Sequence, residues 1–302
     1  MRNVASLSIR VAAAAALMAG CASSDVDSTA AEQGADPTLQ TSLAEMITIP
    51  AGDFIFGCNP AVDSNCLEDE MPHQRVFVDE FQIDQYEVTR EAYYACVAAG
   101  DCSQPFDTFN PDIDLGGLAP DWQTRTNEPW PVIGVTWEPA NTFCKVQGKR
   151  LPTEQEWEKA AKGGCELYND CESDTPINPW GNTEATCTEV VLMTEDQELG
   201  CGEGGAQPVT VRPDGVSPYG VYNMIGNVSE WVDSEYQPHA EGQRDKLKQN
   251  AIGMKINKGA CYGSFTTDMR IAARYTMADA QNYEDVPYSF ETDSAMGFRC
   301  AK

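Results

Sequence analysis

Apolar residues recur at helical and alternating spacings in the second part of the chain, and they predict a mixed α+β domain over residues 45–302. Helices are expected where this spacing follows a capping threonine, namely at 90–99 after Thr89, 137–147 after Thr136, and from 154 to the glycines at 163–164 after Thr153. Short strands are expected at 46–49, 75–78 and 81–86. Glycine and proline, at 24 and 18 residues, are frequent between these elements. We therefore expect an α+β fold with little regular secondary structure.

The third helix begins with a recognisable N-terminal signature. Thr153 and Glu156 have the spacing of a capping box, in which each side chain accepts a hydrogen bond from the main chain of the other residue. The glutamate-rich start of this helix, residues 154–158, is interpreted as a solvated face.

The first 44 residues have the pattern of a processed leader and a tether. Arg2 and Arg10 precede a short apolar run at 11–19, too short to span a bilayer, and Gly20 and Cys21 follow it. This pattern predicts a lipoprotein signal peptide over 1–20 with Cys21 as the lipidated residue, and an ordinary cleaved signal peptide is the alternative. Residues 21–44 are expected to be a flexible tether. The lipid would anchor the protein to the membrane, and we expect an outer-membrane lipoprotein that faces the periplasm or the cell surface.

The charge and the histidine content exclude several classes of function. Acidic residues number 47 and basic residues 20, which gives a net charge of −27. A surface with this charge repels phosphate backbones, so nucleic-acid binding is not expected. Two histidines are too few for a metal centre with three imidazole ligands. Twelve cysteines, several of them in close pairs, indicate disulfides formed in an oxidising compartment. The close pairs are Cys58 with Cys66, Cys96 with Cys102, Cys165 with Cys171, and Cys187 with Cys201.

Seven sequence runs, taken together and in order, carry a family resemblance. They are IPAGDF at 49–54, FQIDQYEVT at 81–89, PVIGVTW at 131–137, GKRLPTEQEWE at 148–158, PWGN at 179–182, YGVYNMIGNVSEW at 219–231 and GFRC at 297–300. This set resembles the formylglycine-generating enzyme, or sulfatase-modifying factor, family. The resemblance implies a C-type-lectin-like α+β fold stapled by disulfides.

The resemblance also indicates how the cysteines pair. It implies a disulfide between Cys144 and Cys300, while a second family disulfide is lost as a pair because Ala161 and Ile271 lie near its positions. The four close pairs would then bridge locally. With Cys21 lipidated, eleven cysteines make five disulfides, and Cys261 is the expected odd residue.

Active members of this family oxidise a substrate cysteine to formylglycine with copper held by two cysteines. In this sequence Ser264 falls at the first of these positions, nothing matches the second, and Cys261 lies three residues too early. Because Cu(I) requires soft thiolate ligands, one thiol cannot build the site, so a copper cofactor is not expected. Cys261 and Ser264 remain the only catalytic candidates. Cys261 is interpreted as an inert buried thiol rather than a reactive one, and Met269 as a core residue rather than a thioether ligand.

A calcium site is implied by the run at 223–230. In the family, an asparagine side chain, two main-chain carbonyls and a glutamate hold the ion, and these positions match Asn223, Gly226, Val228 and Glu230. Such oxygen ligands suit a hard cation, and the ion would be structural. The alternative is a tight loop whose side chains bond to main-chain amides.

The remaining residues with candidate chemistry are interpreted structurally. His73 has no visible nucleophile partner and is expected at the surface or in a hydrogen bond. Arg274 and Arg299 match arginines of the family and are expected in ion pairs or hydrogen bonds.

These observations favour a secreted, lipid-anchored protein whose domain is a non-catalytic binding or structural module. Two alternatives remain. One is a formylglycine-generating-type oxidoreductase that acts on protein cysteines. The other is a lectin-like receptor whose loop at 275–296 recognises a protein or glycan ligand.

Overall fold

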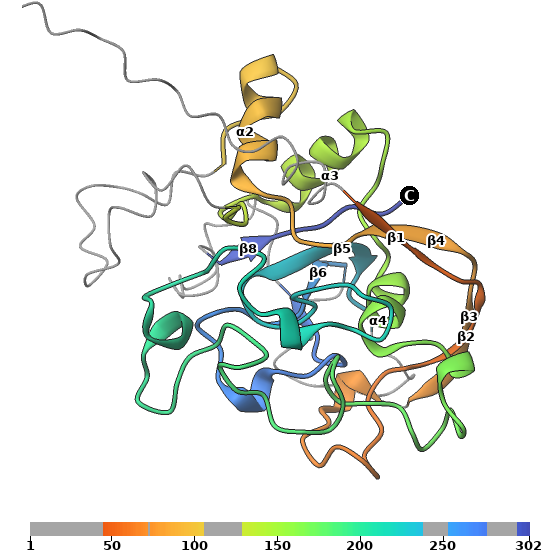
Figure 1. Ribbon diagram of the computed structural model, residues 1–302. Helices are drawn as coiled ribbons and strands as arrows, with labels where there is room; N and C mark the ends of the chain where they lie inside the picture. The colour runs from red at the N-terminus through yellow and green to blue at the C-terminus, as the bar shows by residue number, and fades with distance from the viewer. Residues whose placement is uncertain (1–44, 72, 106–128, 238–252, 277–294) are drawn as a thin grey trace, which may run out of the picture. The chain divides into compact units, whose positions relative to one another are not determined.

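Three small sheets and three α-helices make up the regular structure of the described residues (Figure 1). The structure is a computed structural model that describes residues 45–71, 73–105, 129–237, 253–276 and 295–302. All of them belong to one compact unit, Ala35–Lys302. The predicted signal peptide, Cys21, the tether and most of the loop at 275–296 lie outside these residues. No helix in the described ranges is long and apolar enough to cross a membrane.

The strands are short, and most of their partners are distant in sequence. Two antiparallel pairs join β1 (Met46–Ile49) to β4 (Phe81–Asp84) and β2 (Gly52–Phe56) to β3 (Gln74–Val78). The third sheet has the order β7-β6-β5-β8, with β5 at Ser229–Glu235, β6 at Lys255–Lys258, β7 at Tyr275–Thr276 and β8 at Met296–Gly297. β5 and β8 are parallel, which brings the C-terminal segment beside β5 (Figure 1).

The three helices begin and end close to the predicted positions. They are α2 (Arg90–Ala99), α3 (Trp137–Val146) and α4 (Glu154–Lys162). Thr89 accepts a hydrogen bond from Ala92 N, and Gly100 closes α2 in the left-handed region. The capping box of Thr153 and Glu156 is confirmed. Thr136 precedes α3 but makes no side-chain cap bond, so this part of the prediction is wrong.

Short 3₁₀ helices fill several of the connections. They are η1 (Glu68–Glu70), η3 (Cys165–Leu167), η4 (Leu199–Gly202), η5 (Pro213–Gly215) and η7 (Thr266–Asp268). Together with the short strands, they confirm the expectation of a fold with little regular secondary structure.

Two apolar clusters hold these elements together. The larger contains Trp157 of α4 with residues of β1, β2, β4 and β6. The second is aromatic: Tyr93 of α2, Phe143 of α3 and Phe298 lie with ring centroids 5.5 to 6.1 Å apart. Stacked and edge-on rings at this spacing contribute beyond the area they bury. The C-terminal segment is therefore part of the hydrophobic core.

All five expected disulfides are present. They are Cys58–Cys66, Cys96–Cys102, Cys144–Cys300, Cys165–Cys171 and Cys187–Cys201. Cys261 is a buried thiol outside these five pairs, as predicted.

Two further predictions, one about a strand end and one about a helix face, are wrong. The strand predicted over 81–86 ends at Asp84, whose side chain is buried and paired with Lys149 Nζ at 2.5 Å. Glu154, Glu156 and Glu158 of α4 are also buried, so this part of the helix is not a solvated face. Basic side chains and main-chain donors compensate these carboxylates, which is the condition for burying charge.

Candidate functional site

The segment that corresponds to the family's copper region forms a tight turn at Cys261 and Ser264. Cys261 N donates to Ser264 Oγ at 3.2 Å, and Ser264 N donates to Cys261 O at 2.9 Å. The turn places Cys261 Sγ 3.6 Å from Ser264 Oγ. Both catalytic candidates are thus adjacent, but together they offer one thiol and one hydroxyl.

The described part of the chain supplies no second thiol for Cys261. Ten cysteines are used in disulfides, and Cys21 lies outside the described ranges. Met269 packs in the larger apolar cluster, whereas Cys261 belongs to a separate small cluster with Val191 and Tyr262. Cu(I) binding by paired thiolates therefore does not fit this arrangement.

The expected calcium loop is shaped by residues in the left-handed region. Asn223 and Gly226 have φ of 54° and 73°. A Cβ at Gly226 would lie 2.0 Å from Val190 Cγ2, so only glycine fits this close approach. Asn223 donates both hydrogens of Nδ2, to Glu87 Oε2 at 2.7 Å and to Val209 O at 2.8 Å. Its Oδ1 is consequently the atom that a cation would use.

Glu230 is bound mainly to protein donors. Arg299 holds it with two hydrogen bonds, Nε to Oε2 at 2.7 Å and Nη2 to Oε1 at 2.6 Å. Trp157 Nε1 donates to Oε2 at 2.8 Å. Since each carboxylate oxygen has two lone pairs, these three bonds leave one on Oε1. The prediction that Arg299 is a structural ion-pair residue is confirmed.

A second carboxylate, Glu87, lies beside this group and was not identified from the sequence. It accepts hydrogen bonds from Asn223 and from Asn227 Nδ2 at 3.0 Å. Burial raises the pKa of Glu87 to about 7, with Arg299 opposing the shift and Glu230 adding to it. The only sequence signal was its place in the run at 81–89.

The four expected calcium ligands are donors of the kind that a hard divalent cation binds. Asn223, Gly226, Val228 and Glu230 offer an amide oxygen, two main-chain carbonyls and a carboxylate oxygen. Burial favours the neutral form of Glu87, while Glu230 is paired with Arg299. A cation at this place would favour the ionised form of Glu87.

A buried ionic network surrounds α4 and was also missed. Glu158 Oε1 accepts from Lys162 Nζ at 2.9 Å and from Gly57 N at 2.7 Å, and Oε2 pairs with Lys258 Nζ at 3.1 Å. Burial alone would raise the pKa of Glu158, but the two lysines lower it to about 2. The network ties β2, α4 and β6 together.

Two further arginine–carboxylate pairs adjoin this network. Arg274 holds Glu154 through Nε and Nη2 at 2.7 and 3.0 Å, which confirms the expected structural role of Arg274. Arg270 holds Glu70 through Nη1 and Nη2 at 2.6 and 2.7 Å. Such forked pairs fix both distance and orientation.

His73 is partly exposed, and its Nε2 lies 3.8 Å from Glu172 Oε2. This contact agrees with the expected place of His73 at the surface.

A cleft of about 400 Å³ opens beside α2 and α3. Its lining residues come from the end of β4, the following segment and the facing sides of the two helices. They include Asp84, Tyr86 and Glu91 as well as the apolar Ala95 and Phe143. This mixture of polar groups and apolar surface is typical of ligand sites.

Comparisons with known proteins point to one family. The sequence profile described as "Sulfatase-modifying factor enzyme 1-like domain" matches residues 31–302. The formylglycine-generating enzyme of Mus musculus is 29% identical over 303 residues, which cover 86% of this chain and 75% of that protein. The "Inactive C-alpha-formylglycine-generating enzyme 2" of Mus musculus is 31% identical over 244 residues, which cover 69% of this chain and 75% of that protein.

Solved structures show the same fold. PvdO from Pseudomonas aeruginosa superposes with a TM-score of 0.58 at 23% identity, covering 86% of this chain and 94% of PvdO. Treponema denticola variable protein 1 superposes with a TM-score of 0.57 at 18% identity, covering 85% of this chain and 94% of that chain.

Proposed function

The chain belongs to the sulfatase-modifying factor enzyme 1-like family but has Ser264 at the first copper position and its thiol, Cys261, three residues earlier, so we propose that it is a non-catalytic member that acts as a binding or structural module. The observation that carries this proposal is the turn at Cys261 and Ser264, where a hydroxyl lies 3.6 Å from the one thiol of the described residues. A serine oxygen is a poor ligand for Cu(I). A relative named as inactive, at 31% identity, is consistent with a scaffold that is used without the oxidation.

Copper binding tests this proposal in one pair of proteins. The wild-type protein is titrated with Cu(I) in competition with a chromogenic chelator, beside the variant Ser264→Cys. We expect no tight stoichiometric Cu(I) binding by the wild type. The variant, whose new thiol lies beside that of Cys261, should bind one Cu(I) when both thiols are reduced. One tightly bound Cu(I) per wild-type chain would overturn the proposal and favour the oxidoreductase alternative.

We further propose that Asn223, Gly226, Val228 and Glu230 hold a structural Ca²⁺. The support is the kind of oxygen donor that these residues supply and the orientation of Asn223, whose Nδ2 hydrogens are both donated to protein acceptors, so that Oδ1 is left for a cation. A ligand that binds only the folded state stabilises it by about 2.7 kcal/mol at 100 times its Kd. For a domain of this size, this corresponds to a rise in Tm of about 5–10 °C. An equal Mg²⁺ concentration should have a smaller effect, because its octahedral geometry suits this loop less well. Identical Tm values with Ca²⁺ and with a chelator would contradict the site.

The membrane location is proposed from the leader sequence. Cleavage before Cys21 and its lipidation would anchor the domain to the outer membrane through a tether. Mass spectrometry of the mature N-terminal peptide should show acyl groups on Cys21, and Cys21→Ser should release the protein from the membrane fraction. An unmodified peptide that begins elsewhere would instead indicate an ordinary signal peptide.

The cleft beside α2 and α3 is the proposed place for a protein or glycan ligand of such a module. It combines acidic groups with apolar surface and is separate from the Cys261 turn. Substitution of Ala95 by tryptophan would fill the cleft, whereas Ala98→Trp on the same helix is a matched control outside its lining. Screening of glycan and peptide arrays should show a ligand that Ala95→Trp loses and Ala98→Trp keeps. Equal binding by both variants would place the ligand elsewhere.

A further inference from the structure

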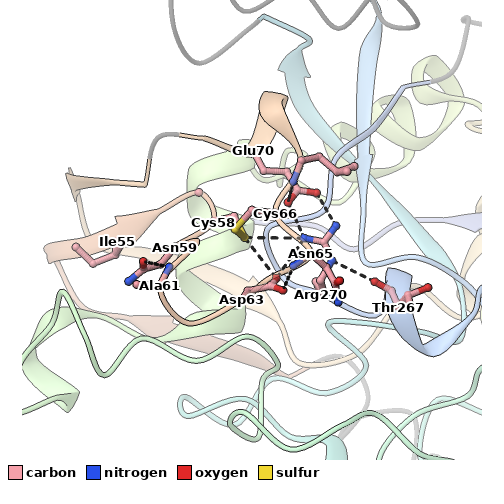
Figure 2. Close-up of a disulfide and its surroundings, with 12 residues drawn as sticks. Ile55, Cys58, Asn59, Ala61, Asp63, Asn65, Cys66, Glu70, Thr267 and Arg270 are labelled. Carbon is pink, nitrogen blue, oxygen red and sulfur yellow. Dashed lines mark hydrogen bonds and ion pairs between the residues drawn. A yellow bond between two sulfur atoms is a disulfide. The ribbon is translucent and has the colours of Figure 1, made fainter.

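The disulfide Cys58–Cys66 closes the loop between β2 and η1 (Figure 2). One of its two cysteines is buried and the other is partly exposed. Cys58 is buried at 3% exposure, while Cys66 is only partly buried and lies between the exposed residues Asn65 and Leu67. An attacking thiolate therefore meets Cys66 first, and Cys58 is the natural leaving group.

A guanidinium lies at the buried sulfur. Arg270 Nη1 is 3.9 Å from Cys58 Sγ, and Glu70 fixes Arg270 with hydrogen bonds of 2.6 and 2.7 Å (Figure 2). Burial would lower the pKa of Arg270, but Glu70 and Asp63 raise it well above its ordinary value, so the group stays charged. A fixed positive charge at this place stabilises a thiolate that forms on Cys58.

Asp63 opposes this effect. Its Oδ2 lies 3.4 Å from Cys58 Sγ and 3.3 Å from Arg270 Nη1, while Oδ1 accepts from Asn65 N at 2.8 Å (Figure 2). Arg270 and Asp63 thus act on the same sulfur with opposite charges. One group favours release of a Cys58 thiolate, and the other restrains it.

We propose that Cys58–Cys66 is a thiol–disulfide exchange site for a protein or peptide thiol. The partner thiolate attacks Cys66 Sγ, a new sulfur–sulfur bond joins the partner to Cys66, and the bond to Cys58 breaks. Cys58 leaves with the electron pair as a thiolate beside Arg270. A second thiol of the partner then displaces Cys66, so the partner is oxidised to a disulfide and the Cys58–Cys66 pair is reduced by the same two electrons.

Two of the other disulfides have different surroundings, whereas Cys96–Cys102 and Cys165–Cys171 also join a buried to a partly exposed cysteine, so the charges near Cys58 are what distinguish Cys58–Cys66. Both cysteines of Cys144–Cys300 are fully buried, which denies access to an attacking thiolate. In Cys187–Cys201, Cys201 Sγ lies 3.4 Å from the carbonyl oxygen of Val190, a neighbour that does not stabilise negative charge. They serve as internal controls for exchange at Cys58–Cys66.

The experiment follows all five disulfides in one sample. The purified protein is treated with dithiothreitol under native conditions, quenched with acid, alkylated and mapped by mass spectrometry. We expect Cys58–Cys66 to be reduced at least about tenfold faster than Cys144–Cys300. In a parallel reaction with 2-mercaptoethanol, the mixed disulfide should form on Cys66 rather than on Cys58.

Two substitutions with opposite expected effects on the reduction rate distinguish an effect of charge from a general loosening of the structure. Arg270→Gln should slow reduction of Cys58–Cys66 by about tenfold, and Asp63→Asn should accelerate it by a similar factor, since each removes one charge near the leaving sulfur. Asp63→Asn keeps the acceptor for Asn65 N and serves alone if Arg270→Gln fails to fold. The proposal is overturned if Asp63→Asn leaves the rate unchanged or slows it. It is also overturned if both variants accelerate reduction of all five disulfides, because that pattern reports loosened structure.

Discussion

Substitution of Glu158 by glutamine tests whether the buried ionic network holds the domain together. Glu158 is 1% exposed and faces two lysines, Lys162 and Lys258, that are also buried. Glutamine has nearly the same shape but no charge. Its amide oxygen can still accept from Gly57 N, while Lys162 loses its paired carboxylate and Lys258 keeps the longer contact to Glu154 at 3.7 Å.

The expected magnitude follows from the pKa of Glu158. A shift from 4.5 to about 2 corresponds to about 3 kcal/mol of stabilisation, at about 1.4 kcal/mol per pKa unit. Removal of one partner from a buried ion pair typically costs about 3–5 kcal/mol. Both arguments give the same order, so we expect Glu158→Gln to lower the free energy of unfolding by about 3 kcal/mol or more.

Urea denaturation of the purified protein at neutral pH measures this loss. Glu156→Gln on the same helix is the matched control, because glutamine also completes a capping box and its partner Arg150 has 41% of its side chain exposed, against 4% and 0% for Lys162 and Lys258. We expect the control to cost about 1 kcal/mol or less. Equal losses in the two variants would refute the claim that burial makes the Glu158 network important.

The pH dependence gives a second readout of the same variant. The folded-state pKa of Glu158 lies below its unfolded value, so its stabilisation is fully present above about pH 4.5 and is lost as pH falls toward about 2. The wild type should therefore lose about 3 kcal/mol more than Glu158→Gln across this window. Parallel stability curves for the two proteins would refute the assigned pKa shift.

Two further predictions concern the calcium loop and the disulfides. Gly226→Ala should lower the free energy of unfolding by about 1–3 kcal/mol more than the control Gly220→Ala, because both glycines have positive φ but only a Cβ at position 226 meets other atoms. Equal losses in the same denaturation assay would contradict the close approach at Gly226. Replacement of Cys144 and Cys300 by serine opens a loop of 156 residues and should lower the free energy of unfolding by about 5 kcal/mol, whereas the same change at Cys165 and Cys171, 6 residues apart, should lower it by about 2 kcal/mol. The reverse order would contradict the loop-closure argument.

Local signals explain what the sequence predicts well. The helix caps at Thr89 and Thr153 depend on residues within one turn, and both are found as expected. The disulfides followed from cysteine spacing and from the family resemblance. Thr136 shows the limit of this reasoning, because a suitable residue before a helix need not direct its side chain to the helix N-terminus.

Long-range pairing explains what the sequence does not show. β8 has two residues and pairs with β5, which begins 67 residues earlier, so no local pattern marks it. The partners of Glu158 lie on β6 and at the end of α4, and without them a glutamate-rich helix start resembles a solvent-facing one. Glu87 was missed for the same reason: its partners, Asn223 and Asn227, are far along the chain.

Turnover of a cysteine peptide tests the central claim most directly. The purified wild-type protein, loaded with Cu(I) under oxygen, is incubated with a peptide that carries a sulfatase-type cysteine, beside a formylglycine-generating enzyme as a positive control. Aldehyde formation is followed by mass spectrometry and by hydrazide labelling. A non-catalytic module should give no aldehyde above the peptide-only control. Copper-dependent aldehyde formation that disappears in Cys261→Ser would contradict the account and show that a single thiol suffices.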